Sequence, residues 1–122
     1  MTKRILVVED QEDNRQILRD LLGSAGFEMV EAGDGQEALV QVAKHKPDLI
    51  LMDIQLPIMD GYEATRRIKA NPETKSIPII VVTSYALSGD EGKARAAGCD
   101  AYVTKPYSPR QLLAKVKEFL PA

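Results

Sequence analysis

The chain contains four short runs of consecutive apolar residues, and most of the segments between them have the apolar spacing of an amphipathic helix. These runs cover residues 5–8, 49–52, 79–82 and 101–103. A strand that is apolar on both faces must be covered on both faces, which is typical of parallel sheets. The alternation of such strands with helices predicts a doubly wound α/β domain with right-handed crossovers.

A weaker fifth strand is predicted at residues 27–30, where polar and apolar side chains alternate as in an edge strand. A helix is also predicted at about residues 87–97, but glycine and alanine dominate it, so we expect it to be the least stable helix. Five strands in 122 residues favour a flavodoxin-like (βα)5 fold with strand order 2-1-3-4-5. We expect residues 1–122 to form a single domain.

Capping residues mark the ends of several helices. Asp34 and Asp60 each stand three residues before a glutamate, which is a variant of the capping box. Ser108 precedes a proline, as expected at the start of the last helix. Gly26 and Gly98 follow helix ends, where a left-handed cap is favoured.

Charge and cysteine content exclude several classes of protein. The chain has 16 Lys and Arg against 18 Asp and Glu, a net charge of −2 that does not favour electrostatic binding of nucleic acid. One cysteine, Cys99, allows no intramolecular disulfide, which fits a reducing compartment. No apolar stretch approaches the roughly 20 residues of a membrane span. We therefore expect a cytoplasmic protein that binds neither nucleic acid nor a membrane.

Polar residues follow four of the apolar runs, where parallel strands place ligand sites. Glu9 and Asp10 follow the run at residues 5–8, and Asp53 follows the run at 49–52. Thr83 follows the run at 79–82, and Lys105 lies just beyond the run at 101–103. Three carboxylates brought together need a counter-charge, which Lys105 and a divalent cation would supply. Because all available ligands are oxygens, the pattern predicts Mg²⁺, with Mn²⁺ as a substitute. A carboxylate in such a site can accept a phosphoryl group.

The same residues carry a resemblance to a known family. Glu9-Asp10, Asp53, Thr83, Lys105-Pro106 and the segment 48–61 resemble the motif set of the bacterial response-regulator receiver domain, also called CheY-like. The resemblance spans nearly the whole chain and looks closest to stand-alone receivers of the DivK type. It implies a signalling switch of a two-component system or phosphorelay rather than an enzyme. The implied phosphoryl donor is the phosphohistidine of a sensor histidine kinase or of a histidine phosphotransfer protein.

The resemblance also implies a role for each residue of the metal site. Asp53 would be the phospho-acceptor and a metal ligand. Asp10 would bind Mg²⁺ directly, and Glu9 would bind it through water. The backbone carbonyl of Gln55 would be a further ligand.

Other residues would respond to phosphorylation. Thr83 and Lys105 would contact the phosphoryl group, and Tyr102 matches an aromatic switch position that would move inward with Thr83. A static core aromatic is the alternative interpretation of Tyr102. The family resemblance further implies a cis peptide between Lys105 and Pro106. Helix 87–97, the strand containing Tyr102 and the last helix would form the output face for an unidentified downstream protein.

Two flanking positions are predicted to set the lifetime of the phosphoryl group. Gln55 and Tyr85 stand two residues beyond Asp53 and Thr83, and the bulky Tyr85 would shield the group from water. The chain is expected to be a monomer or weak dimer. Asp100 matches part of the charge set of receivers that dimerise through their last two helices, but Ala101 does not.

Alternative functions remain. The same chemistry could operate in a receiver cut from a hybrid kinase or a larger regulator, or the fold could serve as a phosphate-independent binding module. A phosphatase of the haloacid-dehalogenase type is disfavoured because Gln55 stands where that family needs a second aspartate. A flavin-binding module is disfavoured because acids follow the first strand, and acids repel phosphate.

Overall fold

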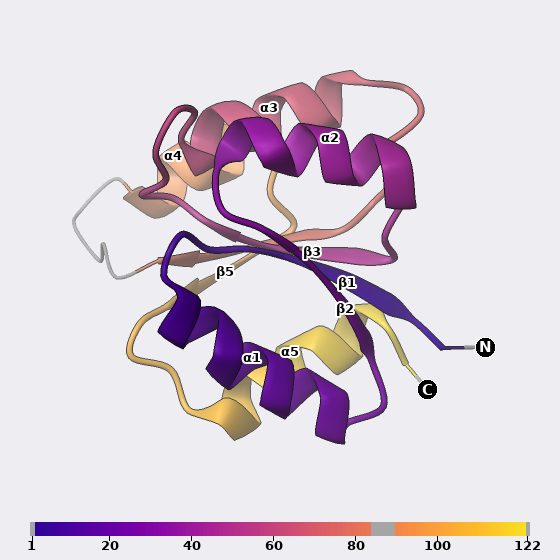
Figure 1. Cartoon of the computed structure of the whole chain (residues 1–122). Coiled ribbons are helices and arrows are strands. Elements are labelled where there is room, and N and C mark those ends of the chain that lie inside the picture. The colour runs from indigo at the N-terminus through magenta and orange to yellow at the C-terminus, as the bar shows by residue number, and fades with distance from the viewer. Residues whose placement is uncertain (1, 84–89, 122) are drawn as a thin grey trace.

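A parallel five-stranded sheet forms the centre of the computed structural model, which describes residues 2–83 and 90–121 (Figure 1). Its strand order is β2-β1-β3-β4-β5, which confirms the predicted topology. The strands are β1 (Arg4–Val8), β2 (Glu28–Ala32), β3 (Leu49–Asp53), β4 (Ile79–Thr83) and β5 (Ala101–Thr104). The described helices are α1 (Glu12–Ser24), α2 (Gly35–His45), α3 (Gly61–Ala70), α4 (Asp90–Ala97) and α5 (Pro109–Phe119).

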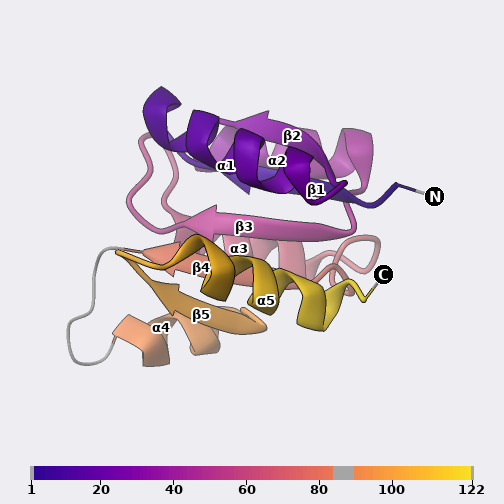
Figure 2. The same ribbon diagram turned by 90° about the horizontal axis from the view of Figure 1, so that it is seen from below.

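The sheet separates two hydrophobic layers. Helices α2, α3 and α4 cover one face, and α1 and α5 cover the other (Figures 1 and 2). Successive strand residues alternate between these layers: Leu6 and Val8 pack with α2 and α3, whereas Ile5 and Val7 pack with α1 and α5. This double burial explains why the apolar runs are continuous.

The edge strand β2 extends to Ala32, beyond the predicted end at residue 30. The strand lies at the edge of the sheet, as predicted, and only Ala32 in it is fully buried. No helix in the described part of the chain is long and apolar enough to cross a membrane.

The predicted caps form as hydrogen bonds. Asp34 and Asp60 each accept the backbone N–H of the glutamate three residues later. Ser108 and Gln111 form a reciprocal capping box at the start of α5. Gly26 and Gly98 adopt positive φ angles of 89° and 107°, as the left-handed caps require.

Charged residues complement the helix dipoles. Acidic residues occupy the first turns of α1, α2 and α3, while basic residues occupy the last turns of α2, α3, α4 and α5. In a parallel α/β sheet all helices begin at the carboxyl edge of the strands. The helix-terminal acids therefore gather at that edge and the helix-terminal bases at the opposite one.

Three large apolar residues in the described part of the chain are exposed: Ile17 of α1, Val40 of α2 and Ile58 of the β3–α3 loop. Ile17, which belongs to the predicted apolar stripe of α1, is 58 % exposed because the sheet contacts only the Leu18 and Leu22 side of the helix. Ile58 in the β3–α3 loop is 81 % exposed and has a φ of 70°, a conformation that β-branched residues rarely adopt. The start of the helix predicted at about residue 87 lies outside the described residues.

Candidate functional site

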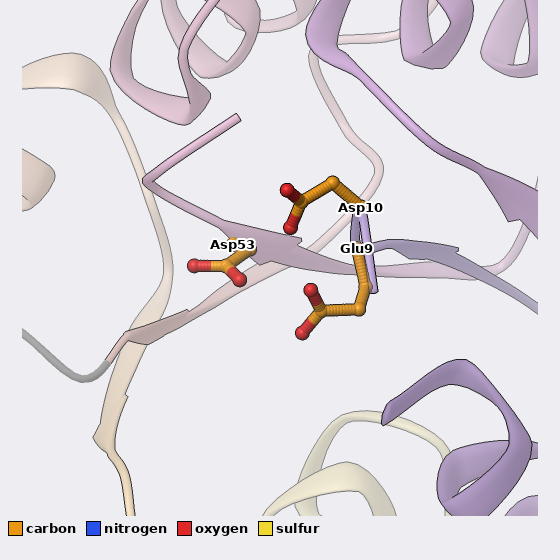
Figure 3. Close-up of side chains that lie close together, drawn as sticks. All are labelled: Glu9, Asp10 and Asp53. Atoms are coloured by element: carbon orange, nitrogen blue, oxygen red, sulfur yellow. The ribbon is translucent and has the colours of Figure 1, made fainter. Parts of the chain in front are cut away.

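Three carboxylates converge at the carboxyl edge of the sheet. Glu9 and Asp10 directly follow β1, and Asp53 ends β3. Because Val8 pairs with Met52 in the sheet, Glu9 and Asp53 lie one step beyond neighbouring strand partners. Oxygen atoms of all three side chains lie within 4.8 Å of one another. Figure 3 shows the three carboxylates around a shared space.

Lys105 supplies the positive charge of this site. Its ammonium Nζ lies 2.9 Å from Oε1 of Glu9 and 3.2 Å from Oδ2 of Asp53. The backbone N–H of Lys105 donates to the carbonyl of Thr83 at 2.7 Å, which fixes the lysine at the end of β5. The peptide between Lys105 and Pro106 is cis, the isomer implied by the family resemblance.

Asp53 is held at the start of a tight loop. Its Oδ1 accepts the N–H of Ile54 at 2.7 Å, and only 12 % of its side chain is exposed. The loop returns toward β3, where the Gly61 N–H donates to the Ile54 carbonyl at 2.9 Å. A Cβ at Gly61 would collide with the carbonyl oxygen of Asp53. Only glycine therefore allows α3 to begin this close to Asp53.

Glu9 is nearly fully buried, and the chain itself holds its carboxylate. Oε2 accepts the N–H of Gln11 at 3.1 Å, and Oε1 accepts from Lys105 and, at 3.4 Å, from the Asn14 amide. Asp10 is exposed. The two adjacent acids therefore differ: the Glu9 carboxylate is hydrogen-bonded within the chain, whereas Asp10 is exposed to solvent at the carboxyl edge of the sheet.

The carboxylates titrate differently. Burial raises the pKa of Asp53, and Glu9 raises it further against the opposing effect of Lys105. Burial and the neighbouring Glu9 carboxyl raise the pKa of Asp10. Burial also opposes ionisation of Glu9, but its contacts with Lys105 and Gln11 lower its pKa overall. Burial disfavours the Lys105 ammonium, yet Glu9 and Asp53 raise its pKa. Without a cation, the site therefore carries unbalanced negative charge.

This donor set fits a hard divalent cation. It offers carboxylate oxygens within 4.8 Å of one another and, among the described residues, has neither sulfur nor imidazole in the cluster. A cation bound there would offset the repulsion that raises the pKa values of Asp10 and Asp53. The site thus combines the mostly buried carboxylate of Asp53, the ammonium of Lys105 and the further carboxylate oxygens of Glu9 and Asp10.

The other predicted site residues lie at different places in the structure. Thr83 ends β4 and is 1 % exposed. Tyr102 pairs with Val81 and packs against the α2–α3–α4 layer, so it is not in the carboxylate cluster. Gln55 lies exposed in the β3–α3 loop. Tyr85 lies outside the described residues, and its shielding role stays a prediction.

Sequence reasoning missed two side chains that support the site. Asn14 donates to Glu9, and Arg15 Nη1 donates to the backbone carbonyl of Glu9 at 2.6 Å. Both stand in the first turns of α1, four and five residues after Asp10. The signal was a pair of adjacent hydrogen-bond donors, Asn14 and Arg15, in the first turns of the helix that follows the acids.

An apolar cleft of about 420 Å³ lies beside Lys105. It is formed between α1 and the segment that joins β5 to α5. Its lining residues include Ile17, Leu21, Pro106, Tyr107 and Pro109. The exposed Ile17 therefore belongs to a surface next to the carboxylate site.

Comparisons with known proteins agree with this arrangement. A family model described as "Response regulator receiver domain" matches residues 5–117. The polar-differentiation response regulator DivK of Brucella ovis is 44 % identical over 120 residues, which cover 98 % of both chains. The similarity therefore extends through nearly the whole sequence.

Solved structures give the same result. A putative response regulator from Chloroflexus aurantiacus aligns over 100 % of both chains with a TM-score of 0.94 and 33 % identity. The receiver domain of a sensor histidine kinase from Pseudomonas aeruginosa, solved with magnesium coordinated in its active-site cleft, aligns over 100 % of both chains with a TM-score of 0.92 and 34 % identity.

Proposed function

Since this chain belongs to the family of response regulator receiver domains, we propose that it is a phosphorylation switch whose acceptor is Asp53. Receiver domains accept phosphoryl groups from histidine kinases or histidine phosphotransfer proteins. The observation that supports Asp53 most strongly is its contact with Lys105 beside the carboxylates of Glu9 and Asp10. We propose that residues 1–122 act as one receiver unit.

The proposed transfer needs little rearrangement of the chain. A carboxylate oxygen of Asp53 attacks the phosphorus of a partner's phosphohistidine. The new P–O bond forms as the P–N bond breaks, and the imidazole nitrogen leaves with the electron pair and takes a proton from water. Lys105, already 3.2 Å from Oδ2 of Asp53, can stabilise the charge on the transferred oxygens.

The cation site is assigned to this chain's carboxylates. We propose that Asp10 and Asp53 bind Mg²⁺ directly, with the carbonyl of Gln55 as a further ligand. Glu9 would act through water, as the family resemblance implies. When bound, Mg²⁺ supplies positive charge that neutralises the carboxylates and the incoming phosphoryl oxygens. Mn²⁺ has the same ligand preference.

Phosphorylation would then shift the population of two states. Thr83 and Lys105 would gain a phosphoryl partner that exists only in the modified protein. Thr83 and Tyr102 lie on the same face of the sheet by strand alternation, which offers a route toward α4 and β5, two parts of the proposed output face. Beryllofluoride, a phosphoryl mimic, should change amide shifts and hydrogen exchange in residues 86–115. Unchanged signals there would exclude this output face.

Two surface features bear on partners. The apolar cleft beside Lys105 is a suitable contact for the protein that carries the phosphohistidine. Asp100, by contrast, is engaged within the chain, where it accepts from Lys69 at 2.9 Å and from the Ile79 N–H at 2.8 Å. This supports a monomer or weak dimer. A cytoplasmic location is proposed because the donors of receiver domains carry phosphohistidine.

Intact mass after incubation with acetyl phosphate tests the function. We expect one labile phosphoryl group on the wild type with Mg²⁺, and none without Mg²⁺ or in Asp53→Asn. Asp13→Asn, which changes an exposed acid of α1, is the matched control and should remain phosphorylated. An adduct that survives in Asp53→Asn would exclude Asp53. No adduct on a wild type that binds Mg²⁺ would favour a phosphate-independent binding module.

A further inference from the structure

Arg15 contacts the backbone of the carboxylate site from outside it. Its Nη1 donates to the carbonyl oxygen of Glu9 at 2.6 Å, and its guanidinium also pairs with Glu12 at 2.6 Å and Glu31 at 3.1 Å. Only 19 % of the side chain is exposed. We infer that Arg15 is a positioning residue that fixes the orientation of Asp10 for the cation; this inference rests on the proposed metal site.

The position of the accepting carbonyl carries the argument. The Glu9 carbonyl belongs to the peptide that links Glu9 to Asp10, so holding that oxygen fixes the peptide plane and with it the position of the Asp10 Cα, from which the side chain extends. The N–H of Glu9 is held separately by the carbonyl of Ala32 at 3.0 Å. The peptide before Glu9 is thus fixed by the sheet, whereas the peptide after it is fixed by Arg15.

Arg15 is itself held by two other elements. Glu12 belongs to the first turn of α1, and Glu31 belongs to β2. These contacts leave the guanidinium little freedom, and its planar fork can serve all three acceptors at once. A rigid side chain that supports a metal ligand through its backbone is comparable to other outer contacts of metal sites, whose loss typically weakens binding about 10- to 100-fold.

Arg19 provides a matched control within the same network. It pairs with Glu31 at 2.6 Å and with Glu12 at 3.3 Å, so it has the same charge and shares both acidic partners. Among the described residues, the hydrogen bonds of its side chain go to Glu31, Glu12 and Gln16, and none goes to the Glu9 carbonyl. Arg15 and Arg19 therefore differ in the contact on which the inference depends.

A purely electrostatic role for Arg15 predicts the opposite result. An arginine near three carboxylates repels an incoming cation, so removing its charge alone should tighten Mg²⁺ binding. Removing a positioning contact should weaken it. The sign of the change in affinity separates the two explanations.

Calorimetric titration of Mg²⁺ into wild type, Arg15→Met and Arg19→Met tests the inference. We expect Arg15→Met to bind Mg²⁺ about tenfold more weakly, and Arg19→Met to bind as tightly as wild type or slightly more tightly. Without metal, amide hydrogen exchange at Asp10 and Gln11 should become faster in Arg15→Met and stay unchanged in Arg19→Met. This second measurement does not depend on the cation.

Arg15→Lys covers the case in which Arg15→Met does not fold. It keeps the charge, but its single ammonium nitrogen cannot reproduce the planar guanidinium fork that reaches Glu9, Glu12 and Glu31 from separate nitrogens, so we expect weaker Mg²⁺ binding than in the wild type. Binding by Arg15→Met, or by Arg15→Lys in its place, that equals or exceeds wild type would overturn the inference while leaving the proposed function intact. A wild type that does not bind Mg²⁺ would instead overturn the proposed metal site, and the inference with it.

Discussion

The three acids of the site share one edge of the sheet but not one environment. Glu9 is buried, and its carboxylate accepts hydrogen bonds from Lys105 and from the Gln11 N–H, so its negative charge stabilises the folded chain. Asp53 is mostly buried and shares the same lysine. Asp10 is exposed at this edge, but partial desolvation there and the neighbouring Glu9 carboxyl raise its pKa. Replacing each acid should therefore have a different effect on stability.

We expect Asp10→Asn to make the metal-free protein slightly more stable. The change removes repulsion from Glu9, and the gain should be at most about 1 kcal/mol because water screens an exposed charge. The same variant should lose the stabilisation that Mg²⁺ gives the wild type. Thermal unfolding with EDTA and with Mg²⁺ measures both effects. A lower melting temperature in EDTA would contradict this account of Asp10.

At this scale, sequence reasoning identified the residues whose type shows their chemistry. Glu9, Asp10, Asp53 and Lys105 follow apolar runs, and parallel strands bring such positions together. Arg15 was not identified because helical spacing indicates which face a residue occupies, but not how far a long side chain reaches across a turn to a backbone carbonyl.

Among the elements, those with strong patterns were predicted well. The continuous apolar runs gave β1, β3, β4 and β5, because both faces of these strands are covered. The exposure of Ile17 was not predicted, since an apolar stripe does not specify which of its residues the sheet contacts. The apolar pattern also does not predict the geometry of loops. The close approach of Gly61 to Asp53 depends on where α3 packs.

Two glycine substitutions should change stability in opposite directions. Gly92 lies in α4, and a Cβ added there would meet no atom within 4 Å, so Gly92→Ala should stabilise the protein by up to about 1 kcal/mol through helix propensity. Gly61→Ala should destabilise it by about 2–3 kcal/mol, because the new Cβ meets the backbone of Asp53. Urea unfolding of both variants measures the difference. Equal changes in the free energy of unfolding would show that the backbone around Gly61 can move to accommodate a Cβ without cost.

For the whole molecule, the proposed cation and the proton would compete for the same carboxylates. The folded-state pKa values of Asp10 and Asp53 are raised. Their protonated forms therefore favour the metal-free folded protein as the pH falls, and that contribution is lost as the pH rises through the raised pKa values. Mg²⁺ needs the ionised forms, so its stabilisation is present at higher pH and lost as the pH falls.

The gain in melting temperature caused by Mg²⁺ should accordingly decrease as the pH is lowered. At a Mg²⁺ concentration about 100 times the dissociation constant, the gain corresponds to about 2.7 kcal/mol. Its loss should begin above the ordinary aspartate pKa of about 3.9. Paired melting curves with Mg²⁺ and with EDTA across pH isolate this effect from other titrating groups. A gain that stays constant down to that pH would contradict the raised pKa values.

The segregation of helix-terminal charges also affects how this protein meets other molecules. With acids in the first turns of three helices and bases in the last turns of four, these helix-terminal side chains contribute an electric dipole along the strand direction. Within roughly a Debye length of about 8 Å at physiological salt, this field turns an approaching molecule before any contact forms. Cations are drawn to the acidic edge, whereas an anionic phosphoryl group is repelled from it. Magnesium occupancy would thus regulate the rate of productive encounters as well as the chemical step.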